Sequence, residues 1–284
     1  MHNQMFHVFR NSPLGRENLL QAAYFCEKEF GLSLVVYVPN HTRFLMRFDT
    51  AEVMVDLDRS YVQYPQTARE HAEAVLAGFK SEHSFHSPSE LADSNLPVVP
   101  VEWGLMSCPR VISEQSSRIG LGHIGPKVRG IAKHAPFPVF IPCLAYRPWA
   151  RVSIFFGGSQ LGALAVKQGI ALARLARVPF TVFTQLDGTS RQECEQTLAE
   201  AKVLDHVRAE DGSWRIFDRG TFEENLYAVP HDSLVVVGAA GHRLMTELIF
   251  GSKLETVQAI LPNPLVVVGP NCRIRPELEP QTAG

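Results

Sequence analysis

The sequence predicts an α/β fold built from two tandem units, each an open, mostly parallel five-stranded sheet flanked by helices. The first observation behind this prediction is that short runs rich in Val, Ile and Phe alternate with longer segments whose apolar residues recur at helical spacing. Continuous apolar strands that alternate with amphipathic helices are typical of a parallel sheet covered on both faces. The second observation is an internal repeat that relates the two halves of the 284-residue chain.

The second half shows these elements most clearly. Its strands are runs of β-branched and aromatic residues, and the fourth is apolar throughout. We expect strands at residues 152–156, 180–184, 214–217, 234–237 and 265–268. The first helix repeats Leu, Ala, Val and Ile on one face, the second turns Glu and Gln to water, and Pro230 stops the third. We expect helices at residues 161–177, 191–204, 222–228 and 252–261.

Two pairs of matching segments define the repeat. Phe9-Arg-Asn-Ser12 matches Phe156-Gly-Gly-Ser159 at an offset of 147 residues. Near the end of each half, Gly125-Pro-Lys127 matches Gly251-Ser-Lys253 at an offset of 126 residues. The two offsets differ by 21, so the first half carries about 21 extra residues between its first and last elements.

These offsets predict two domains, residues 1–147 and 148–284, with the extra residues between Asn40 and Pro109. Within this insertion, Phe44–Phe48 and Val53–Leu57 are apolar runs that we expect to form added structure or a contact surface.

A glycine pattern in the second half predicts an anion site. Gly238-x-x-Gly241 follows the fourth strand, and Gly251-Ser252 opens the next helix after nine further residues. Glycines after a buried strand let a ligand approach the backbone, and the N–H groups of a helix N-terminus attract phosphate. The spacing differs from those of the NTPase and dinucleotide loops. In open α/β sheets, ligands bind at the carboxyl ends of the strands, where these loops are expected to lie.

This motif, followed by Pro264-Leu-Val-Val-Val268, resembles the nucleotide-binding signature of the universal stress protein family. Val152–Ser159 resembles that family's first strand and loop. The resemblance implies two Rossmann-like domains of the adenine nucleotide alpha hydrolase-like type, with ATP or a related adenine nucleotide, with or without Mg²⁺, in the C-terminal domain. The nucleotide-binding residues it implies are Phe155, Phe156, Gly157, Gln185, Val237, Gly238, Gly241, His242, Arg243, Gly251, Ser252 and Lys253.

Some of these positions have a second interpretation. The family usually has Asp where this chain has Gly157, and that carboxylate helps to define the base. A lost hydrogen bond to a charged group, worth about 1.5–3 kcal/mol, would weaken affinity about ten- to a hundredfold. His242 and Arg243 are equally well explained as solvated loop residues. Lys253 lies in a first helical turn, which is unfavourable unless an anion binds there.

The first half resembles a degenerate copy of the same unit. At the offset of 126, Gly238 aligns with Ile112 and Gly241 with Gln115, so neither loop glycine is present. Pro126 replaces the serine of the anion site and removes a backbone N–H. We expect no nucleotide in this half.

Composition excludes several classes of partner. The formal net charge of −2, without long runs of one sign, disfavours nucleic acid and anionic membranes. The longest apolar runs are far shorter than the roughly 20 residues of a membrane span. Five scattered cysteines predict reduced thiols in a cytoplasmic protein. We expect no metal site, because His83 and His86 lack cysteines at ligand spacing.

The resemblance also implies an assembly, since the last strands of this family pair across a two-fold axis. Val139–Ile141 is therefore expected to pair with Leu265–Val268, which makes the chain an intrachain pseudo-dimer, and a further homodimer is compatible with bare sheet edges.

We expect a regulatory or stress-response protein with no catalytic residues and at most slow ATP hydrolysis, because no nucleophile, base and oxyanion donors converge in the sequence. Two alternatives stay open at this point. One is an interaction or scaffold protein without nucleotide, and the other is an enzyme acting on adenylated substrates.

Overall fold

The computed structural model describes residues 3–27, 32–88, 91–92, 95–112, 124–186, 188–209, 212–239, 256–257 and 260–273. The strands of its first half are β1 (Gln4–Val8), β2 (Ser33–Tyr37), β5 (His83–His86), β7 (Leu105–Ser107) and β8 (Val139–Ile141). Those of its second half are β9 (Arg151–Phe155), β10 (Phe180–Gln185), β11 (Gly212–Phe217), β12 (Ser233–Gly238) and β13 (Leu265–Val268).

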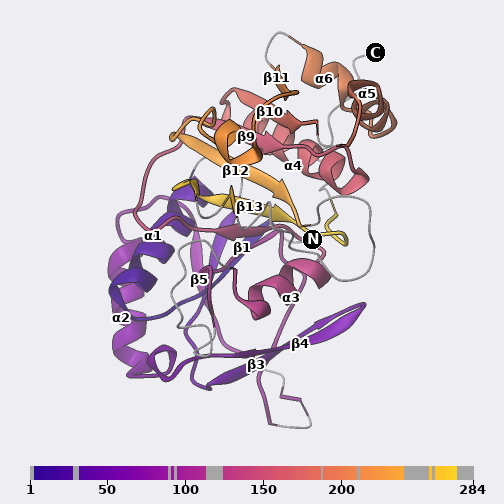
Figure 1. Ribbon diagram of the computed structural model, residues 1–284. Helices are drawn as coiled ribbons and strands as arrows, with labels where there is room; N and C mark the ends of the chain where they lie inside the picture. The colour runs from indigo at the N-terminus through magenta and orange to yellow at the C-terminus, as the bar shows by residue number, and fades with distance from the viewer. Residues whose placement is uncertain are drawn as a thin grey trace.

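These strands form one ten-stranded sheet in the order β11-β10-β9-β12-β13-β8-β7-β1-β2-β5 (Figure 1). Both halves have the same order when read outward from the centre, and their strands run parallel. The two halves meet where β8 and β13 pair antiparallel, with Phe140 opposite Val266. The predicted α/β architecture and the predicted pairing of these last strands are thus confirmed.

Helices cover both faces of the sheet. They are α1 (Pro13–Glu27), α2 (Pro65–Leu76), α3 (Pro126–His134), α4 (Gln160–Ala176), α5 (Arg191–Glu200), α6 (Leu204–Arg208) and α7 (Phe222–Leu226). Ser190 and Thr221 begin α5 and α7 with capping boxes. The prediction of one helix at 191–204 is wrong at its C-terminal end. Helix α5 ends at Glu200, because Lys202 adopts a φ of 59° and separates α5 from α6. No helix within the described ranges is long and apolar enough to cross a membrane.

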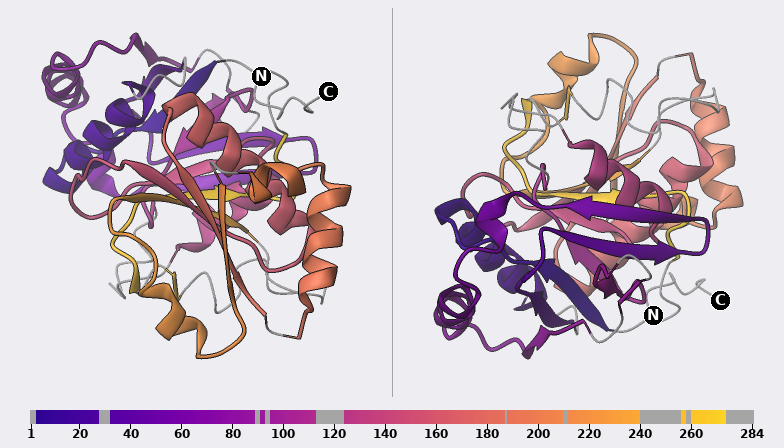
Figure 2. Two further views of the ribbon diagram at one scale, coloured as in Figure 1. Left: turned by 90° about the horizontal axis from the view of Figure 1, so that it is seen from above. Right: turned by 90° about the horizontal axis from the view of Figure 1, so that it is seen from below.

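The insertion forms a second, three-stranded sheet in the order β4-β3-β6, from β3 (Arg43–Phe48), β4 (Ala51–Asp56) and β6 (Val98–Val99). The hairpin of β3 and β4 lies in front of the large sheet in the view from below (Figure 2, right). Phe44, Met46 and Val55 are buried against α3, on the sheet face that α7 covers in the second half. In the described ranges of the first half, no helix corresponds to α7, and the hairpin covers this face instead.

Strand register corrects the repeat alignment at the fourth strand. Phe6 pairs with Met106 in the first half, and Ser153, its counterpart at the offset of 147, pairs with Val235 in the second. Met106 and Val235 are therefore equivalent, at an offset of 129. The expectation that Gly238 aligns with Ile112 is wrong by three residues, because the first half has a loop of different length after this strand. The counterpart of Gly238 is Pro109, so this loop glycine is still missing.

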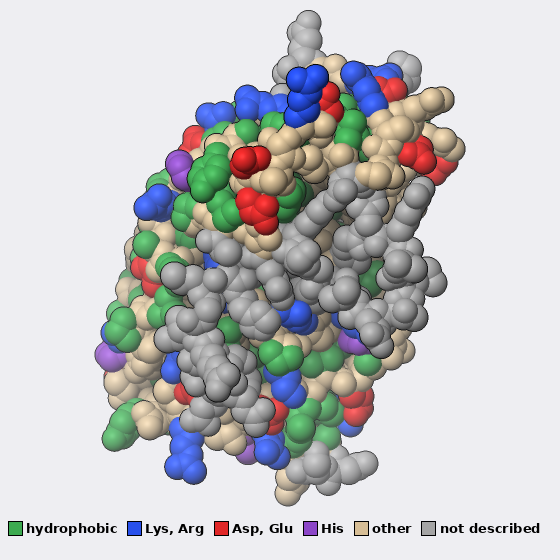
Figure 3. Space-filling model, in the orientation of Figure 1, with side chains coloured by type: hydrophobic (Ala, Val, Ile, Leu, Met, Phe, Trp, Pro, Cys, Tyr) green, Lys and Arg blue, Asp and Glu red, His purple; other side chains and the backbone are tan. Residues whose placement is uncertain are grey.

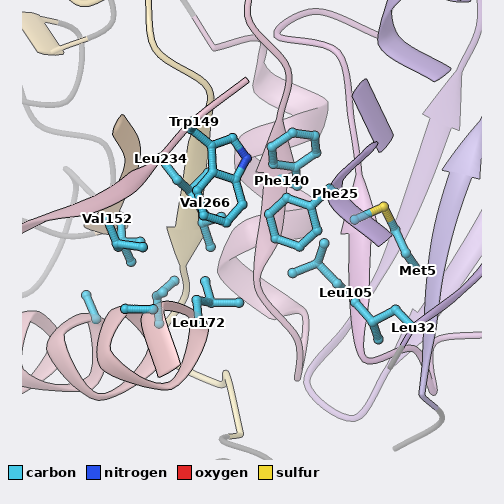
Figure 4. Packing of buried hydrophobic residues seen from close by; sticks show 14 of the residues in the cluster. Met5, Phe25, Leu32, Leu105, Phe140, Trp149, Val152, Leu172, Leu234 and Val266 are labelled. Atoms are coloured by element: carbon cyan, nitrogen blue, oxygen red, sulfur yellow. The ribbon is translucent and has the colours of Figure 1, made fainter. Parts of the chain in front are cut away.

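A continuous apolar core crosses the seam between the halves on the face covered by α1 and α4 (Figure 4). Phe25 from α1 packs against Phe140 of β8, with ring centroids 4.7 Å apart. Trp149, in the connection between the halves, is 3% exposed and lies beside these rings with Val266 of β13. Helix α4 adds Leu172 from the second half. The core thus joins the two halves without interruption.

Candidate functional site

The carboxyl ends of three neighbouring strands in the second half lie side by side. We call the side of the sheet that these ends form the strand-end edge, as distinct from the lateral edges at β11 and β5. β9 lies between β10 and β12, and all three run parallel. The chain order reverses between β9 and β12, which is where open α/β sheets bind ligands. The structure brings together at this edge the predicted residues Phe155, Phe156, Gly157, Gln185, Val237 and Gly238.

The two adjacent phenylalanines point to opposite faces of the sheet. Phe156 is 1% exposed in the core beneath α4, so its side chain is out of reach of a ligand at the edge. Phe155 is half-buried on the other face, and its ring lies 5.9 Å from those of Phe183 and Phe222. Phe217 stacks on Phe183 with an interplanar angle of 12°. This aromatic cluster offers ring faces to a planar group such as a base.

The turn after β9 requires glycine at one of its two positions. Gly158 has a φ of 80°, and a Cβ atom there would lie 3.0 Å from Cγ2 of Thr189. Gly157 is exposed beside it. Ser159 then caps α4, its Oγ accepting a hydrogen bond from the backbone N–H of Gly162 at 3.0 Å. The sequence analysis named Gly157, whereas the backbone conformation of the turn depends on Gly158. The adjacent pair of glycines in the sequence could have indicated this second position.

Gln185, at the end of β10, is held by its neighbours. Its Oε1 accepts a hydrogen bond from Nδ2 of Asn225 at 2.6 Å, and its Nε2 donates to the carbonyl of Gly220 at 3.4 Å. Asn225 also donates to the carbonyl of Arg219 at 2.9 Å. Gln185 thus fixes the turn between β11 and α7, and its amide is already bonded on both sides. Sequence reasoning missed Asn225, although the Thr221 capping box signalled its helix.

Gly238 has room for a side chain. A Cβ atom at Gly238 would lie 3.4 Å from Leu161, an ordinary van der Waals distance, and its backbone pairs with Val268. Val237 beside it is 5% exposed and belongs to the core. The fold therefore gives no reason for glycine at position 238, and the close approach of a ligand would be one.

The predicted phosphate-binding residues lie outside the described residues. They are Gly241, His242, Arg243, Gly251, Ser252 and Lys253. Arg215 of β11 lies over the ring of Phe183, 5.9 Å from its centroid, and so brings a cation to the aromatic cluster. On the face seen in Figure 3, Lys and Arg side chains are interspersed with Asp and Glu side chains.

Metal-ligating side chains are dispersed within the described ranges, where no group of three or more His, Cys, Asp or Glu residues could hold an ion. His83 and His86 occupy β5 three residues apart, so their side chains point to opposite faces. All five cysteines are free and buried, and burial raises the pKa of Cys26, Cys108 and Cys272 to about 12. These thiols are unreactive in the folded state.

Comparisons with known proteins identify the architecture. No protein-family model and no curated protein matches the chain. A universal stress protein structure from Archaeoglobus fulgidus DSM 4304 superposes with a TM-score of 0.57 at 14% identity, covering 94% of this chain and 96% of that one. A protein from Pseudomonas aeruginosa UCBPP-PA14 assigned as a universal stress protein gives 0.54 at 13% identity, covering 95% and 94%. A functionally unknown protein from Pseudomonas aeruginosa PAO1 gives 0.53 at 12% identity, covering 95% and 93%.

Proposed function

We propose that this chain, which has the fold of universal stress proteins, is a tandem member of that family that binds an adenine nucleotide through its second half. In this proposal, residues 1–147 and 148–284 are the two domains, and ATP, with or without Mg²⁺, is the ligand. The role is regulatory, in a stress response in the cytoplasm. Turnover is at most slow ATP hydrolysis.

The observation that carries the proposal is the convergence of the β9, β10 and β12 ends around a surface suited to a nucleoside. Phe155 supplies an aromatic face, and the Gly157-Gly158 turn leaves the backbone accessible beside it. Gly238 allows a ligand to approach the third strand end. The phosphates would then extend toward Gly251 and Ser252, as the sequence motif predicts.

Gln185 has a smaller role in this proposal than the sequence suggested. Because its Oε1 and Nε2 already bond Asn225 and Gly220, we propose that Gln185 mainly positions the edge of the pocket, with one N–H and one oxygen lone pair left for a ligand. Phe156 acts in the same indirect way, by fixing the turn at Gly157 from beneath.

The bonded amide of Gln185 also favours a second candidate, an interaction protein without nucleotide. Gly157 provides no carboxylate for the base, and the neutral amide of Gln185, which already makes one hydrogen bond at each polar atom, is a weaker substitute for it. In that case, the half-buried aromatic cluster around Phe155 would serve a protein partner, and a homodimer of the chain would be one such assembly.

Calorimetric titration with Mg-ATP up to millimolar concentration separates the two candidates. We expect one site per chain, lost in the double variant Gly241→Val with Ser252→Ala. Gly78→Ala is the matched control, because a Cβ at Gly78 meets nothing within 4 Å and the position lies far along the chain from the motif. Absence of heat with the wild-type protein at millimolar Mg-ATP would refute nucleotide binding and leave the interaction protein.

A further inference from the structure

The corresponding edge of the first half is covered by a piece of the insertion. This piece is the Asp58–Tyr61 turn, which consists of Asp58 and the 3₁₀ helix η1 (Arg59–Tyr61). Asp58 caps η1, its Oδ1 accepting a hydrogen bond from the backbone N–H of Ser60 at 2.8 Å. The turn follows the β3–β4 hairpin and reaches back to the end of β1, nearly 50 residues earlier in the chain.

Arg10 holds this turn through three contacts from one side chain. Its Nη2 lies 3.0 Å from Oδ2 of Asp58, and its Nε donates to Oγ of Ser60 at 2.6 Å. Its guanidinium also lies over the ring of Tyr61, 5.4 Å from the centroid. The Asp58 side chain is 16% exposed, so water screens this ion pair less than a surface pair. The planar guanidinium suits such combined ionic and stacking contacts.

The repeat places these contacts at the ligand position of the unit. At the offset of 147, Arg10 is the counterpart of Gly157, and Val8 is the counterpart of Phe155. Tyr61 is 2% exposed and packs in the same cluster as Val8 and Cys108. In the second half, the position beside Phe155 stays partly open. In the first half, the Tyr61 ring fills the equivalent position beside Val8.

Little space remains beneath the turn. A cleft of about 40 Å³ separates it from β1 and α1. Its polar lining residues include His7, Arg10, Ser12, Asn18 and Tyr61. A cavity of this size holds a few water molecules, whereas ligand pockets for molecules of nucleotide size measure roughly 300 Å³ or more.

We propose that the Asp58–Tyr61 turn is the resident occupant of the ligand position in the first half, held there by Arg10, and that it closes this half to nucleotides. The chain's own insertion thereby fills one strand-end edge, whereas Phe155 stays half-buried at the equivalent position of the second half. This inference does not depend on nucleotide binding by the second half, because it concerns a different edge and different residues.

Cys108 reports directly on this closure. It follows β7, is fully buried, and belongs to the same buried cluster as Tyr61. Its labelling by N-ethylmaleimide, followed for each cysteine by peptide mass spectrometry on the intact native chain, measures opening of the turn. In Tyr61→Ala and in Arg10→Ala, we expect Cys108 to react about tenfold faster or more, with Cys26 and Cys272 unchanged. Arg43→Ala is the matched control, because it removes a salt bridge to Asp56 in the same insertion but away from this edge.

Three results would overturn the proposal. One is an unchanged Cys108 rate in both variants, since the turn would then not shield this edge. Another is an equal increase at all five cysteines in both variants, because the turn would then be part of the global core and not a separable occupant. The third is a changed Cys108 rate in the wild-type protein under millimolar Mg-ATP, which would show nucleotide entering the first half. Failure of the second half to bind Mg-ATP in calorimetry would refute the proposed nucleotide site there. It would not affect these three tests of the first half.

Discussion

His7, in the middle of β1, makes the folded protein sensitive to acid. Its imidazole is 1% exposed, and neither ring nitrogen has a hydrogen-bond partner among the described residues. Burial lowers the pKa of His7 from 6.5 to about 3. Ser107, its register partner on β7, has a buried hydroxyl that makes no hydrogen bond to the described part of the chain either, so a charged imidazole at this site would be poorly compensated.

The sign and size of the effect follow from linkage between protonation and folding. Because the folded-state pKa lies below the unfolded one, the unfolded chain binds a proton at His7 first, and stability falls as pH drops below 6.5. Each pH unit in this window costs about 1.4 kcal/mol, so lowering the pH from 7 to 4.5 removes about 2.5 kcal/mol. All pH values between 7 and 4.5 lie above the folded-state pKa of His7. Protonation of His7 in the unfolded chain therefore accounts for nearly all of the lost stability.

Urea unfolding of the wild-type protein and His7→Leu at pH 7 and pH 4.5 measures this effect. We expect the variant to lose about 2.5 kcal/mol less than the wild-type protein between the two pH values. Burial also lowers the pKa of His86, but that contribution is present in both proteins and cancels in the difference. His83→Leu is the matched control, since His83 is exposed on β5, and it should follow the wild-type protein. Equal acid losses in the wild-type protein and His7→Leu would refute the reasoning.

Three further predictions concern the second half. Gly158→Ala should lower the unfolding free energy by about 1–2 kcal/mol because of its positive φ, whereas Gly238→Ala should stay within about 0.5 kcal/mol, and thermal unfolding of both checks the contrast. Asn263 is 1% exposed and donates to three backbone carbonyls, so Asn263→Leu should cost about 2–3 kcal/mol in urea unfolding; a loss below 0.5 kcal/mol would contradict this. A double-mutant cycle with Gln185→Ala and Asn225→Ala should give a coupling of about 1 kcal/mol, and additive losses would show that their hydrogen bond contributes nothing.

The sequence predicted β12 and β13 well because both are continuous apolar runs in the centre of the sheet, whereas the outermost strand β11, with its exposed Arg215, begins two residues earlier than predicted. The strand predicted at 152–156 is shifted by one residue, and the strand predicted at 180–184 is one residue longer at its end. The pairing of the last strands was implied by the resemblance to universal stress proteins, and the structure has this pairing. Periodicity failed at Lys202, where a single left-handed residue ends α5 in the middle of an amphipathic pattern.

The missed features of the sites all involve contacts between residues distant in sequence. Asn225 bonds Gln185 across 40 residues, and Arg10 pairs with Asp58 across 48 residues. A sequence motif records spacing along one segment, so it cannot show that an amide is already bonded or that an arginine faces an aspartate from an insertion. The alternation of side chains along β9 could have shown that Phe155 and Phe156 face opposite sides of the sheet.

The difference between the two edges has to be tested in the intact chain, because the seam makes the halves interdependent. Phe140 on β8 and Val266 on β13 are 2% and 0% exposed, and they lie in the centre of the sheet. Separating the halves would turn both strands into bare apolar edges and uncover the Phe25 and Trp149 rings that pack across the seam. An isolated second half would then aggregate or self-pair, and a loss of nucleotide binding in it would say nothing about its pocket. Point variants at Arg10, Tyr61 or Gly238 avoid this problem, because none of these residues lies on β8 or β13, the two strands of the seam.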